Sequence, residues 1–579
     1  MKNLRILPSK NVRIIQSLLL IIQMELIHSI FTGVVETKSG KVRGLLQKSS
    51  FLGIKIQKFL NIPYAEAPVG KLRFEKPQPK KPWNGILNST DVTIACFQRF
   101  IKGWNLTEDC LILNVWSPYP TPKNAAVMVY IHGGSFRSGS YDSESQNGAN
   151  IVAIGNVILV TLNYRLSLLG FLSKANSGVK ENLGLFDQRL AMKWVKENIA
   201  AFGGNPDAIT LFGLSAGAAS VSAHTLSPGS WKYFDRVILQ SGNMLMNWTL
   251  STESQAKTAS ETFLKSVNCA NATDVLQCLK TKITQQTLQR IYSRKPFIFE
   301  AVWTAPTVDG DFLKDHPQKL FATGQVKPSP IILGVTKDEM FYRNDAILYR
   351  TRDPKNITKI FQENLEKIFP RNSEMLTVAR SLYSSDCTQT FIEAFRPLVD
   401  LQSDLAFTCP IKQEAILRTR FIDSSNVYLY RYSYSSPVPY RAFPRGMFGF
   451  AAHGSDSLSV YGIPLNNSAY PEEDKILSKR IILYFTNFAK NGNPNIGTTK
   501  LPLVSTLPRW PPHSKSGQEY LDMRSLSQMV VERKIRHKYC QFWSKPEEFL
   551  LSTTNISSRK TTSQLILIVV FFYNMCKFL

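Results

Sequence analysis

The sequence lacks the features that mark metal-binding, membrane-spanning and repeat proteins. It has seven histidines, and its eight cysteines form no C-x-x-C motif with a histidine pair nearby, so no metal site is expected. Its two terminal apolar stretches, residues 14–24 and 565–573, are shorter than the roughly 20 residues of a transmembrane helix. No internal repeat or low-complexity linker divides the chain, which favours one large domain with insertions.

Acidic residues are scarce relative to basic ones. The chain has 69 Lys and Arg against 43 Asp and Glu, a formal net charge of +26 at pH 7. Such an excess can attract nucleic acid or anionic surfaces, but no dense basic run and no zinc-finger or RNA-recognition motif accompanies it. We therefore expect a solvated basic surface and no nucleic-acid partner.

Both ends of the chain are typical of processing signals. A basic leader precedes the apolar residues 14–24, which predicts a secretory signal peptide over residues 1–32, with an uncleaved anchor as the alternative. Residues 551–579 combine small residues, a polar spacer and a short apolar tail, as a GPI-anchor signal does, and a weakly packed tail fits them equally well. The folded domain is then expected over residues 33–550 of a secreted or surface-anchored protein.

Cysteine spacing and glycosylation sequons fit the same compartment. Cys96 lies close in sequence to Cys110, and Cys269 to Cys278, and in an oxidising environment such pairs form local disulfide loops. N-x-S/T sequons, the acceptors of N-glycosylation in secreted proteins, stand at Asn88, Asn105, Asn247, Asn271, Asn356, Asn466 and Asn555.

Short apolar segments rich in β-branched residues predict an α/β fold with a mainly parallel central sheet flanked by helices. Runs of this kind read as strands buried on both faces. A helix with its apolar positions at helical spacing is expected over residues 187–201, and helical insertions over residues 250–300 and 354–420. The expected strands are residues 127–131, 157–162, 209–212, 237–240 and 331–334.

A candidate nucleophile follows the third of these strands. Gly213-Leu214-Ser215-Ala216-Gly217 stands between the strand and a small-residue segment expected to be a helix, which is the setting of a nucleophile elbow. The flanking glycines would let the backbone turn tightly and present the hydroxyl of Ser215. The pentapeptide alone fits an ordinary tight turn equally well.

A serine nucleophile needs a base and an acid that orients the base. Among the histidines that follow Ser215, His453 stands in a glycine-rich apolar stretch that suits a catalytic loop, whereas His316 and His513 stand beside prolines in polar contexts typical of the surface. Asp338 and Glu339 follow the strand at residues 331–334, where catalytic loops gather, and chemistry alone does not choose between them.

A glycine-rich turn after the strand at residues 127–131 is a candidate oxyanion hole. In Ile131-His132-Gly133-Gly134-Ser135 the glycines would let backbone N–H groups approach a substrate. The donors are expected to be Gly134, Ser135 and Ala216, the last directly after the nucleophile. The alternative is an ordinary turn, which the presence of the elbow motif in the same chain disfavours.

These residues together resemble the type-B carboxylesterase/cholinesterase family of α/β-hydrolases over nearly the whole mature chain. Three segments are similar to signatures of that family: residues 202–217, residues 108–114, and the tripeptide Gln240-Ser241-Gly242. The resemblance implies that Ser215, Glu339 and His453 form the triad. It also implies disulfides Cys96–Cys110, Cys269–Cys278 and Cys409–Cys540, which leaves Cys387 unpaired.

Departures from the family pattern bear on the substrate. Cholinesterases usually have a glutamate before the nucleophile, where this chain has Leu214, and an aromatic residue where it has Arg137. The resemblance therefore implies a carboxylesterase that hydrolyses small-molecule esters without a cofactor. A cholinesterase is the first alternative. A non-catalytic cell-adhesion member is the second, although such members have lost the nucleophile that Ser215 would provide.

Overall fold

The computed structural model of the chain describes residues 31–49, 51–89, 93–99, 103–141, 147–173, 178–293, 304–369, 373–383, 390–423, 426–438, 449–497, 507–525 and 528–544. Residues 1–30 of the expected signal peptide, the C-terminal tail, Asn555 and Cys387 lie outside these ranges. Within them, no helix combines the length and the apolar character needed to cross a membrane.

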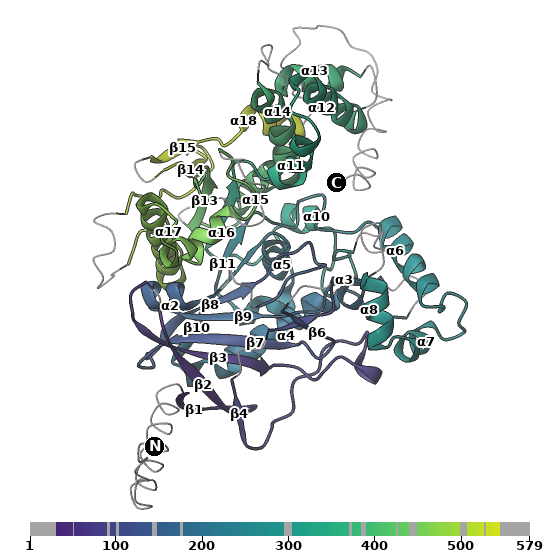
Figure 1. Ribbon diagram of the computed structural model, residues 1–579, viewed down its shortest axis with the longest axis vertical. Coiled ribbons are helices and arrows are strands. Elements are labelled where there is room, and N and C mark those ends of the chain that lie inside the picture. The colour runs from purple at the N-terminus through teal and green to yellow at the C-terminus, as the bar shows by residue number, and fades with distance from the viewer. Residues whose placement is uncertain are drawn as a thin grey trace, which may run out of the picture.

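A mixed sheet runs through the described part of the chain (Figure 1). Its strands are β1 (Phe31–Thr37), β2 (Gly40–Lys48), β3 (Lys55–Pro63), β4 (Ile86–Asn88), β7 (Ile112–Pro118), β8 (Ala125–Ile131), β9 (Ile158–Leu162), β10 (Gly204–Leu214), β11 (Arg236–Gln240), β12 (Ile331–Thr336), β13 (Val427–Tyr432), β14 (Glu519–Met523) and β15 (Met529–Arg533). The order is β1-β2-β3-β7-β9-β8-β10-β11-β12-β13-β14-β15, with β4 beside β2. The run from β9 to β14 is parallel, and antiparallel pairs flank it on both sides. A separate two-stranded sheet pairs β5 (Ile94–Cys96) with β6 (Asn105–Thr107).

The central strands are buried on both faces, as their apolar sequences predict. Along β8, Val127, Val129 and Ile131 belong to one hydrophobic cluster, while Met128 and Tyr130 belong to a second cluster on the opposite face. The alternation follows from the two-residue period of a strand. Each such side chain contributes about 1.5–3 kcal/mol by its burial, so this core fixes the strand ends that carry the site.

Helices cover both faces of this sheet. The first cluster includes apolar residues of α4 (Leu183–Asn198) and α5 (Ala216–Thr225), and the second includes those of α2 (Ala149–Gly155) and α17 (Glu472–Asn491). Short elements complete the layers: η1 (Gly70–Leu72), α3 (Ser167–Phe171), η2 (Ile199–Phe202), η3 (Pro228–Tyr233), α10 (Pro317–Ala322), α16 (Ser455–Val460) and η6 (Ile463–Asn466).

The two predicted helical insertions are present. The first consists of α6 (Glu253–Ser266), α7 (Val275–Lys282) and α8 (Gln285–Ser293), at the right of Figure 1. The second consists of α12 (Pro354–Ile368), α13 (Glu374–Tyr383), α14 (Phe391–Ser403), the π-helical turn η4 (Asp404–Thr408) and α15 (Cys409–Arg418). Its helices α12–α14 gather with α11 (Phe341–Arg350) and α18 (His537–Ser544) at the top of the view, and the disulfide Cys409–Cys540 ties α15 to α18.

One sequence-based expectation about the histidines is wrong. His513 is fully buried, not exposed, because its N–H donates to the carbonyl of Val427 at 2.7 Å and its Nδ1–H donates to that of Glu519 at 2.9 Å. These bonds dock the segment against β13 and β14, a long-range contact that its polar, proline-rich sequence context does not reveal. His316 is exposed, as expected.

Candidate active site

Ser215 stands at a strained turn between β10 and α5. Its backbone has φ 59° and ψ −124°, a conformation that non-glycine residues rarely adopt and that costs on the order of 1–3 kcal/mol. The turn is held because the N–H of Ser215 donates to the carbonyl of Gln240 at 2.8 Å. A Cβ at Gly217 would lie 2.0 Å from the carbonyl oxygen of Ile131, and one at Gly213 would lie 2.5 Å from the carbonyl carbon of Gly217. Both glycines are therefore required by the close approach of backbone to backbone.

Glu339 and His453 lie in hydrogen-bond contact. His453 Nδ1 is 2.6 Å from Glu339 Oε2, and the other carboxylate oxygen accepts the N–H of Thr336 at 2.7 Å. Glu339 is fully buried, whereas the side chain of His453 is 12% exposed. A carboxylate only accepts, so the Nδ1 of His453 carries the proton and Nε2 keeps its lone pair as a base.

Asp338, the other candidate acid, has a different set of partners. Its carboxylate forms an ion pair with Arg396 of α14 and accepts the N–H of Ala451 at 2.8 Å. Its own N–H donates to the carbonyl of Ala451 at 2.9 Å. Burial raises the pKa of Asp338, and the charge of Arg396 opposes that rise. Asp338 thus joins the turn that carries Glu339 to the loop that carries His453.

The glycine turn after β8 packs directly against the elbow. A Cβ at Gly133 would lie 2.6 Å from the carbonyl oxygen of Leu214 and 3.1 Å from the Cβ of Ser215. Gly134 has φ +115°, and Ser135 has φ 56°. Among the residues that the structure describes, none accepts a hydrogen bond from the N–H of Gly134, Ser135 or Ala216. Ala216 is fully buried, and Gly134 and Ser135 are partly exposed, so these three donors are available to a ligand.

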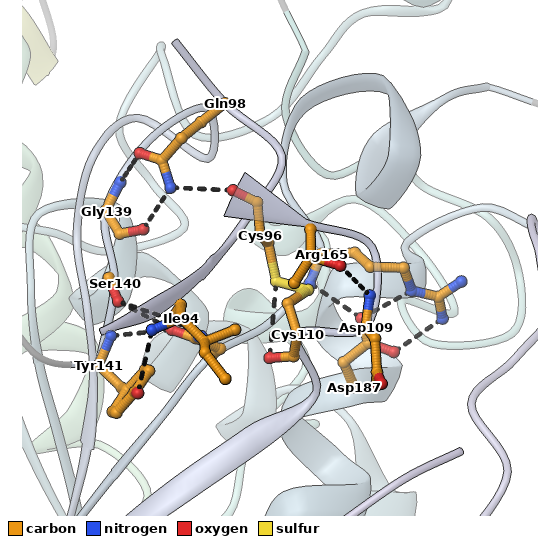
Figure 2. The surroundings of a disulfide bond; sticks show 12 residues. Ile94, Cys96, Gln98, Asp109, Cys110, Gly139, Ser140, Tyr141, Arg165 and Asp187 are labelled. Atoms are coloured by element: carbon orange, nitrogen blue, oxygen red, sulfur yellow. Dashed lines mark hydrogen bonds and ion pairs between the residues drawn. A yellow bond between two sulfur atoms is a disulfide. The ribbon is translucent and has the colours of Figure 1, made fainter. Parts of the chain in front are cut away.

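The disulfide region supports the far end of this turn (Figure 2). Gln98, two residues after Cys96, holds Gly139 from both sides: its Oε1 accepts the N–H of Gly139 at 2.8 Å, and its Nε2 donates to the carbonyl at 2.7 Å. The Cys96–Cys110 disulfide anchors the strand that precedes Gln98. Beneath the turn, burial lowers the pKa of His132 to about 4, so this histidine is neutral at pH 7.

Three residues near Glu339 and His453 were not found by sequence reasoning. The rings of Tyr342 and Phe407 lie 5.4 Å and 4.9 Å from that of His453. Asp456 is buried and accepts hydrogen bonds from Tyr430 and Gln240, and burial raises its pKa, with a smaller contribution from the charge of Glu339. Their spacing from the predicted site residues could have pointed to two of them, since Tyr342 follows Glu339 by three residues and Asp456 follows His453 by three.

The structure also describes the cysteines and most of the sequons that the sequence analysis named. All three disulfides, Cys96–Cys110, Cys269–Cys278 and Cys409–Cys540, are formed. In the described ranges, no group of three or more His, Cys, Asp or Glu side chains is placed to hold a metal ion. Of the sequons, Asn247 is partly buried, and the exposed ones are Asn88, Asn105, Asn271, Asn356 and Asn466.

A parallel sheet with a serine elbow after one strand, an acid turn after another and a histidine loop beside it defines an α/β-hydrolase. The chain belongs to the carboxylesterase family, whose pattern it matches over residues 32–543. It is 38% identical to a cholinesterase of Mus musculus over 536 residues, which cover 88% of this chain and 86% of that protein. It is 34% identical to an acetylcholinesterase of Bungarus fasciatus over 552 residues, covering 90% and 87%. The protein is a carboxylic ester hydrolase, as its motifs predict.

Proposed function

We propose that this protein is a serine carboxylesterase whose catalytic triad is Ser215, His453 and Glu339. The observation that carries the proposal is the 2.6 Å hydrogen bond between His453 Nδ1 and the buried carboxylate of Glu339. The histidine loop also meets the elbow, because a Cβ at Gly454 would lie 3.3 Å from Cδ2 of Leu214. A base oriented in this way, beside a serine on a strained turn, is the arrangement that activates a hydroxyl.

The reaction follows from these positions. Ser215 Oγ attacks the ester carbonyl carbon while His453 Nε2 takes its proton, and the imidazolium then protonates the departing alcohol oxygen. The acyl-enzyme is released when water, deprotonated by His453, attacks it and Ser215 regains its proton. The carboxylate of Glu339 accepts the Nδ1–H of His453 and stabilises the imidazolium. The N–H groups of Gly134, Ser135 and Ala216 hold the oxyanion, and each such donor typically contributes about 2.7–4 kcal/mol.

We infer a general ester substrate in preference to a choline ester. Leu214 supplies no charge beside the nucleophile, and Arg137 follows the oxyanion turn with a positive charge. A cholinesterase is the second candidate, because both reported relatives carry that name and the ring of Tyr342 stacks on His453. An aromatic ring attracts a quaternary ammonium group through its face.

Turnover of p-nitrophenyl butyrate and acetylthiocholine by the purified protein tests both statements. We expect hydrolysis of the neutral ester, loss of that activity in Ser215→Ala, and retention in Ser254→Ala, a matched change on an exposed position of α6. Activity unchanged in Ser215→Ala contradicts the proposed nucleophile. A higher kcat/KM for acetylthiocholine than for the neutral ester favours the cholinesterase.

We also propose that the enzyme is secreted, with cleavage of residues 1–32, glycosylation at exposed sequons and a mature domain over residues 33–550. Three disulfides and five exposed sequons support this assignment. Residues 551–579 are a candidate GPI signal. Release of the enzyme from intact cells by a phosphatidylinositol-specific phospholipase supports the anchor, and spontaneous appearance of the full activity in the medium contradicts it.

A further inference from the structure

Arg396 of α14 contacts both the turn after β12, which carries Glu339, and the loop that carries His453. Its guanidinium forms an ion pair with the carboxylate of Asp338, which directly precedes Glu339. The same guanidinium lies over the ring of Phe450, three residues before His453, with its Cζ 4.5 Å from the ring centroid. A cation over the face of an aromatic ring is an attractive contact. One side chain of the second helical insertion therefore holds a residue of the turn and a residue of the loop.

The turn and the loop are also joined directly, beside this arginine. The N–H of Asp338 donates to the carbonyl of Ala451 at 2.9 Å, and the N–H of Ala451 donates to Oδ2 of Asp338 at 2.8 Å. The other carboxylate oxygen, Oδ1, is the one that Arg396 contacts. Both oxygens of Asp338 are thus occupied, one by the loop and one by α14, so the carboxylate is held in one orientation.

Phe450 extends this contact to the helix that follows Glu339. Its ring stacks on that of Phe341 at a centroid distance of 4.3 Å and an interplanar angle of 21°, and meets the ring of Phe395 edge-on at 6.2 Å. Phe341 begins α11, two residues after Glu339, and Phe395 directly precedes Arg396 on α14. The ring therefore packs the loop against both helices.

The charge of Arg396 matters because its partner is buried. The side chain of Asp338 is 1% exposed, and that of Arg396 is 28% exposed. Burial raises the pKa of Asp338, and the charge of Arg396 is the largest effect that opposes this rise. A buried carboxylate that loses its ion-pair partner takes up a proton or moves toward solvent. Either change would alter the contacts that join the turn to the loop.

We propose that Arg396 is a positioning residue for ester hydrolysis. By holding Asp338 and Phe450 together, it keeps the proposed acid at hydrogen-bond distance from the proposed base. The proposal rests on the proposed triad, and it names a residue that acts through its neighbours. The hydrogen bond that it protects joins His453 Nδ1 to Glu339 Oε2 at 2.6 Å. Because a positional error of about 1 Å can cost on the order of a hundredfold in rate, loss of this support should lower kcat more than it changes KM.

Steady-state hydrolysis of p-nitrophenyl butyrate tests the role, with active sites counted by the release of p-nitrophenol from diethyl p-nitrophenyl phosphate. We expect Arg396→Met to lower kcat per active site by about tenfold to a hundredfold, while KM changes by less than about threefold. Arg396→Lys keeps the charge and should regain part of the loss. The matched control is Arg380→Met, which removes an arginine that pairs with Glu366 at 3.0 Å in the same insertion and should keep the wild-type kcat.

Chemical rescue separates this role from a general loss of structure. Arg396→Ala removes the guanidinium from a position that solvent reaches, so guanidinium chloride at tens of millimolar should raise kcat of this variant several-fold. The same addition should not raise kcat of the wild type. It should also leave Arg396→Ala/Asp338→Asn unchanged, because that variant lacks the carboxylate that would bind the cation. Sodium chloride at equal concentration controls for ionic strength.

The outcomes separate this proposal from the one on which it rests. Failure of the wild-type protein to hydrolyse p-nitrophenyl butyrate overturns the serine esterase, and this role with it. With an active wild type, an unchanged kcat per active site in Arg396→Met, an equal loss in Arg380→Met, or no rescue by guanidinium overturns the role of Arg396 alone.

A second variant keeps the test decisive if Arg396→Met yields no folded protein. Phe450→Leu removes the ring that Arg396 covers and leaves the ion pair with Asp338 in place, so no buried charge loses its partner. A fall in kcat per active site with little change in KM supports the positioning role. A wild-type kcat in this variant overturns it.

Discussion

Replacing Glu339 by glutamine keeps the shape of the side chain and changes one acceptor oxygen into a donor amide. The carboxylate now meets two donors, the Nδ1–H of His453 at 2.6 Å and the backbone N–H of Thr336 at 2.7 Å. Glutamine has a single acceptor oxygen, so in either orientation its NH₂ group faces one of these donors.

The two orientations differ in cost. If the NH₂ faces Thr336, a buried backbone N–H loses the carboxylate oxygen that accepts it, which costs about 1–3 kcal/mol. If it faces His453, the imidazole only moves its proton from Nδ1 to Nε2, and both groups stay hydrogen-bonded. The second orientation therefore wins, and it leaves Nε2 protonated and unable to accept the proton of Ser215. We expect kcat to fall by about 10³–10⁴, or about 4–5.5 kcal/mol, with little loss of stability.

Steady-state hydrolysis of p-nitrophenyl butyrate and the thermal unfolding midpoint measure the two quantities separately. Glu363→Gln, the same change at an exposed position of α12, is the control for the loss of a carboxylate and should match the wild type in both. A Glu339→Gln enzyme with kcat within tenfold of the wild type and a clearly lower unfolding midpoint would refute the reasoning. It would mean that the carboxylate supports the fold and not the tautomer of His453.

Further predictions concern stability and the glycine turn after β8. Serine replacement of the Cys409–Cys540 pair, which closes 131 residues, should lower the unfolding free energy by about 5 kcal/mol, against about 2.5 kcal/mol for the nine-residue bridge between α6 and α7, as denaturant titration would show. Gln98→Leu removes both hydrogen bonds to Gly139, so kcat for p-nitrophenyl butyrate should fall about tenfold or more while KM changes less. A Gln98→Glu enzyme in which the fall in kcat is accompanied by a lower unfolding midpoint would argue against a local effect. Burial lowers the folded pKa of His132 to about 4 from about 6.5, so the stability it contributes is present above pH 6.5 and is lost as the pH falls from 6.5 to 4, by about 3 kcal/mol. The pH dependence of the unfolding midpoint should accordingly be shallower in His132→Gln over that window.

The local sequence was sufficient to predict a structural element where the local geometry requires a particular type of residue. The expected strands at residues 127–131 and 331–334 appear as β8 and β12, because short apolar runs rich in β-branched residues suit strands that are covered on both faces. The elbow could be predicted from the sequence for the same reason: only glycine fits at positions 213 and 217, where a Cβ would clash with backbone atoms. By contrast, β10 begins at Gly204, inside a segment whose glycines and proline predict a helix end, and its register shifts before Ile209.

Features that depend on contacts between distant segments could not be predicted from the local sequence. The chemistry of the two residues does not decide whether Asp338 or Glu339 is the acid. They are adjacent, and the conformation of the turn after β12 decides which carboxylate faces His453. The structure separates them through Arg396 and Ala451, which occupy Asp338 and come from remote segments. The burial of His513 has a similar origin, since its partners belong to β13 and β14 and not to its sequence neighbours.

The second helical insertion contacts the turn that carries Glu339 and the ring of His453. Arg396 of α14 pairs with Asp338, the hydroxyl of Ser403 accepts the N–H of Met340 directly after Glu339, and the ring of Phe407 packs 4.9 Å from that of His453. Each contact reaches His453 or a residue next to Glu339, so a displacement of the insertion would change the orientation of the Glu339 turn and of the imidazole together. Since a positional error of about 1 Å can cost on the order of a hundredfold in rate, sequence changes in this insertion can alter turnover without touching a substrate.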